Sequence, residues 1–436
     1  MDRLDVEQAE LKDLVRIEDV SFYMDDPFPV YARLRREQPV FYYEPLDIFV
    51  LSRGEDIRWA SRHPEIFSSA QGLMLSHLRL PSALGVDIRS AFFDPEGEPF
   101  FFTDPPRHRQ LRRIVSPAFS PVGVASLEND IRAAARGLVD TIEPGEPVEY
   151  VTEIAGKLPV LVQARLLGVP TEDFEQIRVW TEALELISGG MINLATEEIA
   201  AAARTFATMK DFFREQFKIK RRQPGDDLIS TLLSADLDGE PLSEARMLNY
   251  CLIFMGSTDT TRALLSGLAF GLATNPDQLA ALAADRSLMK AAVEEGLRWT
   301  TPARGFIRTV TQDTEIRGQV IRAGQHVYLL DVSANYDEET YPDPQRFDIS
   351  RGPDLAHMSF GYGVHTCIAA PMVRIETAIF FNEILDRYPS LEIAGQPRRV
   401  AQIVRQGWEE LPLRFFAAGD RAAATAGPLS PAGAGS

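Results

Sequence analysis

Cysteine is almost absent from this chain, and its scarcity limits the chemistry that the chain can perform. Only two of the 436 residues are cysteines, Cys251 and Cys367. Two cysteines exclude a disulfide framework and any zinc or iron–sulfur site built from four thiolates. They also suit a reducing compartment. A functional thiol in this chain must therefore act alone.

Long hydrophobic runs and an excess of basic residues are missing as well. The first twenty residues are heavily charged, so we expect no signal peptide or membrane anchor there. No other stretch reaches the ~18 uninterrupted apolar residues that a membrane-spanning helix requires. The formal net charge of −18 argues against nucleic acid, because phosphate backbones bind basic surfaces. We therefore expect a cytoplasmic protein with no membrane or nucleic acid partner.

Helical periodicity is present through most of the chain, whereas strand-like segments are short and do not alternate with the helices. The fold class that this order predicts is mainly α with small β-sheets rather than a doubly wound sheet. Residues 1–416 read as a single domain, and 417–436, rich in Ala, Gly, Pro and Ser, read as a disordered tail. The expected helices are 27–38, 106–118, 123–142, 171–189, 194–222, 243–274, 286–299 and 368–388. The expected strands are 48–52, 309–316, 325–330 and pieces near 391–415.

Cys367 ends the sequence Phe-Gly-Tyr-Gly-Val-His-Thr-Cys, which begins at residue 360. Two alternating glycines permit a backbone that approaches a flat ligand closely. Residues 368–376 read as a helix start, whose amides favour a thiolate by lowering the pKa of the thiol. A single thiolate held in this way suits one bond to a soft metal, and a haem iron is the obvious case. Cys251 lies in an apolar run and is expected to pack as a small hydrophobe.

The segment 243–274 predicts one long buried helix with an unusual middle, Gly-Ser-Thr-Asp-Thr-Thr at 256–261. These residue types are poor helix formers, and an ionisable group in a buried helix is costly. Two interpretations remain open. The hydroxyls could bond back to carbonyls one turn earlier and bend the helix. Alternatively, hydroxyl and carboxyl groups could face a ligand in a local groove and pass protons.

Together these motifs resemble the cytochrome P450 family of haem-thiolate monooxygenases over about residues 20–415. The cysteine loop matches the family's Phe-Gly-x-Gly-x-His-x-Cys signature, with Ala369 where the family usually has glycine. The resemblance implies the cytochrome P450 fold. Haem b would lie between a long distal helix and the cysteine loop, with Cys367 as the metal ligand.

The resemblance also assigns residues to the haem carboxylates. In the sequence Asp-Pro-Pro-Arg-His-Arg-Gln-Leu-Arg-Arg at 104–113, His108 and Arg112 match positions that bind haem propionates. Arg308 matches a further propionate arginine, and His365 matches the propionate histidine. Four such groups for two carboxylates agree with the rule that buried charges must be paired.

Further residues are assigned to structure rather than to chemistry. Glu295 and Arg298 match the family's Glu-x-x-Arg motif, which Arg346 would complete as a folding and haem-retention network. His357 is better explained as a structural histidine. Arg304 stands where the family often has an apolar pocket residue. It is expected either to make a propionate or surface contact or to pair with a substrate carboxylate.

Asp259 and Thr260 match the acid–alcohol pair with which the family delivers protons to bound dioxygen, and they are the predicted catalytic residues. Ser257 replaces a glycine that is common in the family. Its hydroxyl could join the relay or tighten the oxygen pocket.

The expected function is insertion of one oxygen atom of O2 into an apolar small molecule, by hydroxylation or oxidative dealkylation. Electrons would come from NAD(P)H through ferredoxin reductase and ferredoxin. The resemblance places the substrate pocket in 70–102, 175–200, 252–257 and 303–306. The alternatives are a peroxide-driven enzyme of the same family and a non-catalytic haem-thiolate sensor.

Overall fold

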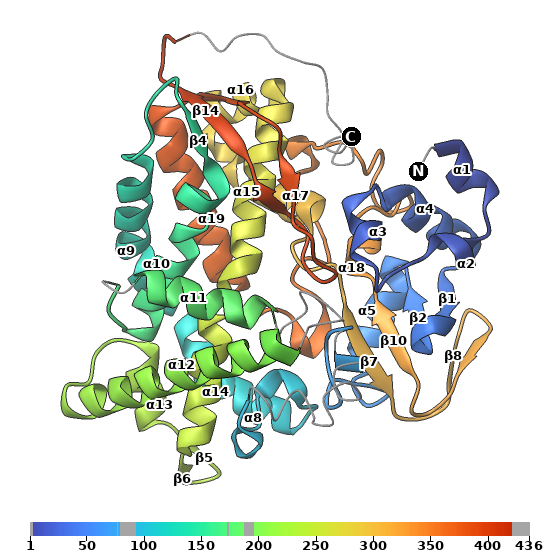
Figure 1. Cartoon of the computed structure of the whole chain (residues 1–436), viewed down its shortest axis with the longest axis horizontal. Coiled ribbons are helices and arrows are strands. Elements are labelled where there is room, and N and C mark those ends of the chain that lie inside the picture. Colours follow the sequence, from blue (N-terminus) through green and yellow to red (C-terminus); the bar gives the residue numbers. More distant parts are fainter. Residues whose placement is uncertain (1–2, 76, 79–92, 172–173, 187–195, 421–436) are drawn as a thin grey trace.

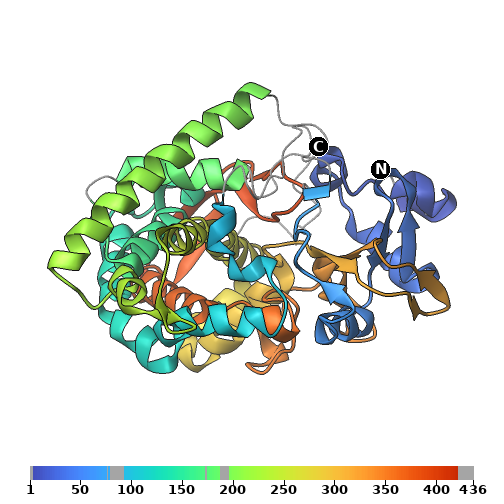
Figure 2. The same ribbon diagram turned by 90° about the horizontal axis from the view of Figure 1, so that it is seen from below.

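Helices fill one side of the molecule, and a five-stranded sheet with the N-terminal helices fills the other (Figure 1, Figure 2). The computed structural model describes residues 3–75, 77–78, 93–171, 174–186 and 196–420. It confirms the predicted mainly helical class with small sheets. Most of the expected tail, 421–436, lies outside the described residues.

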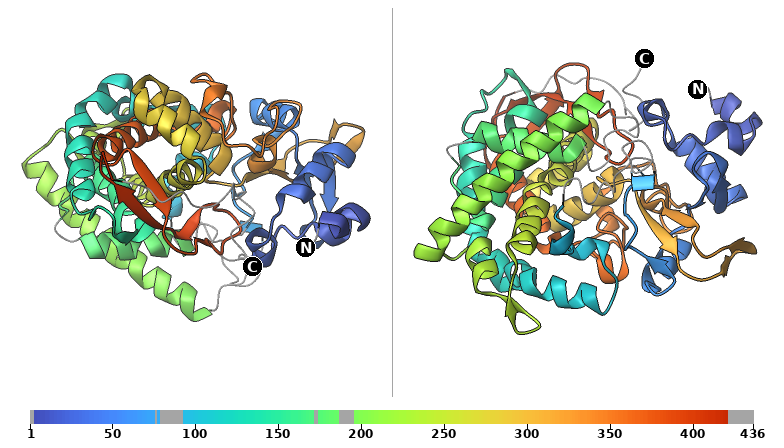
Figure 3. Two further views of the ribbon diagram at one scale, coloured as in Figure 1. Left: turned by 90° about the horizontal axis from the view of Figure 1, so that it is seen from above. Right: turned by 60° about the horizontal axis from the view of Figure 1, so that its bottom comes forward.

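The helical side is built around α15, which Figure 3 shows in the interior, with other helices on several sides of it. It packs on α10 and α17, while α19 packs along α9. The helices of this side are α8 (Arg107–Val115), α9 (Pro121–Val139), α10 (Lys157–Leu167), α11 (Phe174–Glu185), α12 (Thr196–Arg222), α13 (Leu228–Ser234), α14 (Glu244–Met255), α15 (Thr258–Thr274), α16 (Pro276–Ala284), α17 (Met289–Thr300) and α19 (Ala370–Arg387).

The N-terminal helices cover the five-stranded sheet, whose strand order is β1-β2-β10-β7-β3. The strands are β1 (Val40–Tyr43), β2 (Ile48–Leu51), β3 (Phe67–Ser68), β7 (Phe306–Val310) and β10 (His326–Leu329). The helices beside them are α1 (Arg3–Gln8), α2 (Leu11–Leu14), α3 (Val20–Met24), α4 (Phe28–Glu37), α5 (Gly54–Arg62) and α18 (Asp331–Ala334).

Smaller sheets contain the remaining strands of the described chain. The expected strand 309–316 was wrong, because β7 ends at Val310 and a separate hairpin follows. These strands are β4 (Pro147–Glu149), β5 (Asp236–Leu237), β6 (Glu240–Pro241), β8 (Thr314–Ile316), β9 (Gln319–Ile321), β11 (Ser390–Ile393), β12 (Arg398–Arg399), β13 (Trp408–Glu410) and β14 (Pro412–Phe416).

The expected continuous helix 243–274 is interrupted, so this prediction was also wrong. The helix α14 ends at Met255, and α15 begins at Thr258. The Ser257 hydroxyl donates to the Phe254 carbonyl at 2.8 Å, which gives that carbonyl a partner outside the regular helical ladder. A Cβ on Gly256 would lie 3.0 Å from Leu184 of α11, so the small residue lets α11 pack closely there. The break separates two helix ends at the centre of the molecule.

None of the helices in the described part of the chain combines the length and the apolar character that crossing a membrane requires.

Candidate functional site

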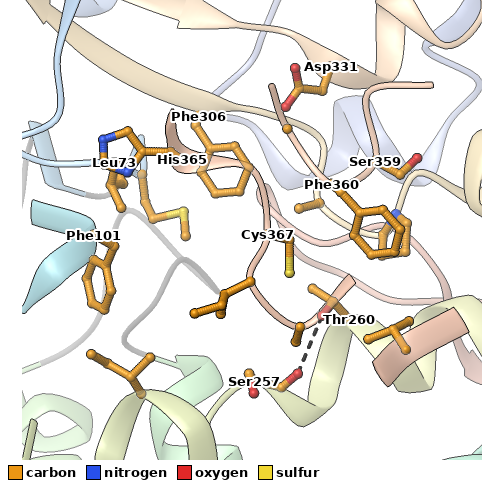
Figure 4. Close-up of a pocket in the computed structure, with 18 of the residues that line it drawn as sticks. Leu73, Phe101, Ser257, Thr260, Phe306, Asp331, Ser359, Phe360, His365 and Cys367 are labelled. Carbon is orange, nitrogen blue, oxygen red and sulfur yellow. Dashed lines mark hydrogen bonds between the residues drawn. The ribbon is translucent and has the colours of Figure 1, made fainter. Parts of the chain in front are cut away.

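A cavity of about 380 Å³ lies between the α14–α15 break and the cysteine loop (Figure 4), within the size range of small-molecule sites. Cys367 lines it from the loop, and Ser257, Thr260 and Thr261 line it from the helices. Aromatic and aliphatic side chains form much of the remaining wall. Among these are Leu73, Met74, Phe93, Phe100, Phe101, Phe102, Ile253, Phe254, Leu264 and Phe306.

The loop before Cys367 has the backbone that its glycines predicted. Gly361 and Gly363 adopt positive φ angles of 65° and 74°. A Cβ on Gly363 would lie 2.2 Å from the Ser61 carbonyl oxygen, so this position excludes a side chain. By contrast, a Cβ on Gly361 would meet nothing within 4 Å, although Gly361 lines the cavity. The loop therefore closes tightly on α5 and leaves open space beside the thiol.

The electrostatic environment of Cys367 differs from the expectation. Burial raises the pKa of this thiol, while the backbone amide of Ala369, the Arg112 guanidinium and the amide of Ala370 lower it. The predicted helix-terminal amides are present, but they do not outweigh desolvation. The residue's exposed surface faces the cavity, which explains how an enclosed thiol can remain accessible. Cys251 is buried as expected, and burial also raises the pKa of its thiol.

The four predicted propionate residues lie together at this cavity. Arg112, Arg308 and His365 line it, and the His108 ring lies 4.3 Å from the His365 ring between centroids. Burial lowers the pKa of His108 to about 4 and that of His365 to about 2, with neighbouring cations contributing. Burial also lowers the pKa of Arg308 to about 10. The cluster thus brings guanidinium charges and hydrogen-bond donors together in the buried part of the cavity.

These residues fit a haem because some of their buried hydrogen-bonding groups lack acceptors that a haem would supply. Neither ring nitrogen of His108 has a hydrogen-bond partner among the described residues. Within the described part of the chain, Arg308 Nη1 donates only to the neighbouring Ile307 carbonyl, at 2.7 Å. Buried donors of this kind require acceptors, and two carboxylates would supply them. The open space at Gly361 and a single facing thiol complete a cradle for a flat, iron-containing group.

The predicted acid–alcohol pair is divided by the fold. Thr260 lines the cavity, and its hydroxyl lies 3.5 Å from the Ser257 carbonyl oxygen. Asp259 is absent from the described lining and pairs with two arginines. Arg262 reaches it at 2.5 Å from the next helical turn, and Arg405 reaches it from the segment between β12 and β13. The acid is therefore held beside the groove rather than in it.

The Ser257 hydroxyl is already engaged in holding the helix break. It donates its one proton to the Phe254 carbonyl and accepts a hydrogen bond from Gln163 Nε2 at 2.9 Å. Gln163 comes from α10 and is buried. Gln163 carried no sequence motif, so only the packing of α10 on α15 reveals it.

Arg304 does not line the cavity, which contradicts its predicted pairing with a substrate carboxylate. Its Nη1 donates to the carbonyls of Gln402, at 2.6 Å, and Arg405. The guanidinium also lies over the Tyr23 ring, 4.2 Å from the centroid. The residue is buried, so the surface-contact interpretation was wrong as well, and Arg304 instead joins the 402–405 segment to α3.

The predicted Glu295–Arg298 pair is fully buried, with a 2.7 Å contact. Arg298 Nη1 also donates to the carbonyls of Asn335 and Pro344 at 2.9 Å each. Arg346 joins this network as expected, through its main chain. The carbonyl of Arg346 accepts a hydrogen bond from Arg298 Nη2 at 3.1 Å, and a second arginine side chain, that of Arg351, lies 3.5 Å from Glu295.

A second buried network lies beside the first. Glu294 accepts hydrogen bonds from Arg374 at 2.6 Å and pairs with His357 at 3.0 Å. Burial raises the pKa of Glu294, but these two partners outweigh it and lower the pKa to about 2. The structural interpretation of His357 is confirmed. Glu294 and Arg374 carried no separate signal in the sequence.

The substrate pocket predicted from the resemblance is reproduced in part. Its 70–102, 252–257 and 303–306 segments all contribute lining residues. No residue of 175–200 does so within the described chain, and 187–195 of that stretch lie outside the described residues.

Comparisons with known proteins agree with this geometry. A family model described as cytochrome P450 matches residues 184–401. A steroid C26-monooxygenase of Mycobacterium tuberculosis is 32% identical, over 92% of this chain and 97% of its own length. A linalool 8-monooxygenase of Pseudomonas putida is 31% identical, over 88% of this chain and 94% of its own. The solved structure of CYP108D1 from Novosphingobium aromaticivorans is 30% identical, with a TM-score of 0.83 over 94% and 99% of the two chains.

Proposed function

Since this chain belongs to the cytochrome P450 family and is a monooxygenase of that family, we propose that it oxidises an apolar small molecule in the cavity beside Cys367. The reaction is insertion of one oxygen atom of O2 by hydroxylation or oxidative dealkylation. The observation that carries the proposal is the arrangement of Cys367 and Thr260 on opposite sides of one largely apolar cavity.

The family implies haem, and Cys367 is the proposed iron ligand. Arg112, Arg308, His108 and His365 are the proposed partners of its two propionates. When bound, the haem supplies dioxygen activation, which a thiolate ligand promotes by pushing electron density toward the iron. The amides of Ala369 and Ala370 stabilise negative charge on the Cys367 sulfur.

Thr260 and Asp259 are the proposed proton-delivery residues. The Thr260 hydroxyl faces the cavity and can hold or pass a proton there. Asp259 must first exchange at least part of its contact with Arg405 or Arg262 for contact with Thr260 or a water molecule. Until that exchange, the two arginines would hold the Asp259 carboxylate in place beside the cavity.

The cavity wall and the relatives support a proposal for the substrate class. Phe93, Phe101 and Phe102 pack edge to face along one wall, which favours an apolar ligand. Among the relatives, the names specify a steroid and a terpene alcohol, and a solved structure contains testosterone. We propose a substrate of the same broad class, a steroid or terpenoid.

Ferredoxin, reduced by ferredoxin reductase and NAD(P)H, is the proposed electron source. The chain is acidic overall, yet Arg109 and Arg113 are exposed on α8, the helix that also carries Arg112. A local basic surface beside the cofactor cavity would attract an acidic electron carrier. The cytoplasmic location expected from the sequence stays a prediction.

The proposal is tested by the absorbance of purified, haem-loaded protein. Steroid and terpene libraries should shift the haem spectrum, and responding ligands should be oxidised when NADH, ferredoxin and its reductase are added. Cys367→Ala should abolish the thiolate-type spectrum of the carbon monoxide complex. Retention of that spectrum would refute the ligand assignment. Ligand binding without turnover would favour a sensor, and turnover with peroxide alone would favour a peroxide-driven enzyme.

A further inference from the structure

Asp331 is a buried acid at the cavity that the proposed mechanism leaves unused. It is the first residue of α18, separated from the end of β10 by Leu330, and it is 3% exposed. Figure 4 shows it across Cys367 from Ser257 and Thr260. Its side chain belongs to the cavity lining, yet no hydrogen bond or ion pair to its carboxyl group is recorded within the described chain. A buried carboxyl group without a partner requires a ligand or a proton.

The titratable groups that face Asp331 are Arg308 on β7 and Tyr328 on β10. Arg308 in turn faces Asp104 and His365. Asp104 already accepts hydrogen bonds from the Ser68 hydroxyl and the Ser69 amide. Among the described residues, Arg308 is therefore the nearby cation that Asp331 could use, and the haem assignment gives Arg308 to a propionate.

The charges of this cluster determine whether Asp331 can be ionised when two propionates are bound. The guanidinium groups of Arg112 and Arg308, which both line the cavity, supply two positive charges to the cluster. Two propionates balance those charges, while the Asp104 carboxyl group is held separately by Ser68 and Ser69. An ionised Asp331 would add a third negative charge in a buried place, where like charges at close range cannot all remain ionised.

We propose that Asp331 stays a carboxylic acid in the haem-loaded protein and donates a hydrogen bond to the propionate at the Arg308 end of the cavity. This inference rests on the haem-binding part of the proposed function. It agrees with the direction of the Asp331 pKa, which burial raises well above its usual value and Arg308 only partly offsets.

A consequence follows for the reduction potential. Reduction adds one negative charge to the haem, so the reduced protein holds the Asp331 proton more tightly than the oxidised protein does. By linkage, the potential must fall with rising pH wherever the acid–propionate pair titrates. An asparagine keeps a donor at this place but cannot titrate.

The test is spectroelectrochemical titration of the haem-loaded protein across pH, comparing the wild type with Asp331→Asn. We expect the pH slope of the potential to decrease in the variant. A carboxylic acid band in the redox-induced infrared difference spectrum should disappear with it. The control is Asp337→Asn, a buried acid of the following turns that does not line the cavity, and it should change neither signal. An unchanged slope and band in Asp331→Asn would overturn the proposal.

A second variant separates the hydrogen bond from the titration. Asp331→Leu removes the donor, so haem transfer to excess apomyoglobin should be faster than in the wild type, whereas Asp331→Asn should retain haem nearly as well. Equal transfer rates in all three proteins would also refute the proposal. Failure of the haem assignment itself is distinguishable, because the wild type would then show no thiolate-type carbon monoxide spectrum.

Discussion

At the scale of single residues, the family motifs identified which side chains surround the cavity but not how each one is held. Cys367, Thr260, Arg112, Arg308 and His365 all line it. The sequence located these residues because each belongs to a short pattern whose loop or helix geometry is local. The pairing of Asp259 with Arg405 and the carbonyl partners of Arg304 could not be predicted, because these groups lie in the 402–405 segment, distant in sequence.

Asp259→Asn should lower product formation roughly 10²-fold, because the amide cannot supply the proton that we assign to this acid. Oxidation of NADH should decrease less, so that reduced oxygen species accumulate instead of product. The measurement is the ratio of product to NADH consumed. Asp277→Asn, at an acid of the first turn of α16, serves as the control. If the ratio of product to NADH consumed were unaltered in Asp259→Asn, Asp259 would have no role in proton delivery.

Arg304→Leu should leave ligand binding unchanged, since Arg304 does not line the cavity. It should destabilise the fold by about 3 kcal/mol, because two buried carbonyls lose their charged donor. Urea unfolding measures the stability, and the haem absorbance shift measures binding. A selective loss of affinity for carboxylate ligands with unchanged stability would restore the discarded substrate role.

At the scale of elements, the break between α14 and α15 is what opens the distal side of the cavity. The sequence contained its cause, a glycine and hydroxyl residues inside an apolar helix. Both interpretations of that segment apply in part. The Ser257 hydroxyl bonds back to Phe254, and Thr260 faces the cavity. At the break, the Ser257 side chain also accepts a hydrogen bond from Gln163 of α10, which periodicity could not identify.

Ser257→Ala should destabilise the protein by about 1–3 kcal/mol, because the Gln163 amide loses its acceptor in a buried place. Gln163→Leu combined with Ser257→Ala should recover part of that loss, since no buried donor is then left unpaired. Thermal unfolding of the two single variants and the double variant gives the coupling energy. Ser266→Ala, which removes a buried hydroxyl bonded within its own helix, is the matched control. Strictly additive effects of the two substitutions on stability would contradict a direct hydrogen bond between Gln163 and Ser257.

At the scale of the whole molecule, buried networks join the cysteine loop to α17 and α19. Glu294 links α17 to His357, just before the loop, and to Arg374 on α19. Glu295 and Arg298 link α17 to the 335–346 segment. These networks fix the loop relative to the helices that surround it. Removing them should therefore lower the free energy of unfolding.

Glu294→Gln should flatten the acid side of the stability profile. The folded-state pKa of Glu294, about 2, lies below its unfolded value of 4.5. The stabilisation is therefore complete above about pH 4.5 and is lost as pH falls toward 2, by about 3 kcal/mol at most. Urea unfolding between those pH values measures it. Asp354→Asn, at an exposed acid, is the control. Parallel profiles for Glu294→Gln and the wild type would refute the assignment.

Arg109→Glu combined with Arg113→Glu should raise the KM for ferredoxin roughly tenfold at low salt, and the effect should shrink as salt increases. Ligand binding should not change, because both side chains are exposed. Steady-state kinetics with varied ferredoxin and salt give the result. Arg322→Glu with Arg398→Glu makes the same charge change directly after β9 and on β12. Equal effects of the two pairs would show a response to net charge rather than to a docking surface.

The sequence by itself determined the mainly helical class, the cysteine loop and the family, because glycine geometry, helical periodicity and motif spacing are properties of short segments. Only the tertiary structure decided that Asp259 is held by Arg405, that Arg304 lies outside the cavity lining and that Asp331 lines the cavity with no hydrogen bond to its carboxyl group from the described residues. The physical reason is that the energy of a buried charge depends on which distant segments surround it. That environment exists only after the chain has folded.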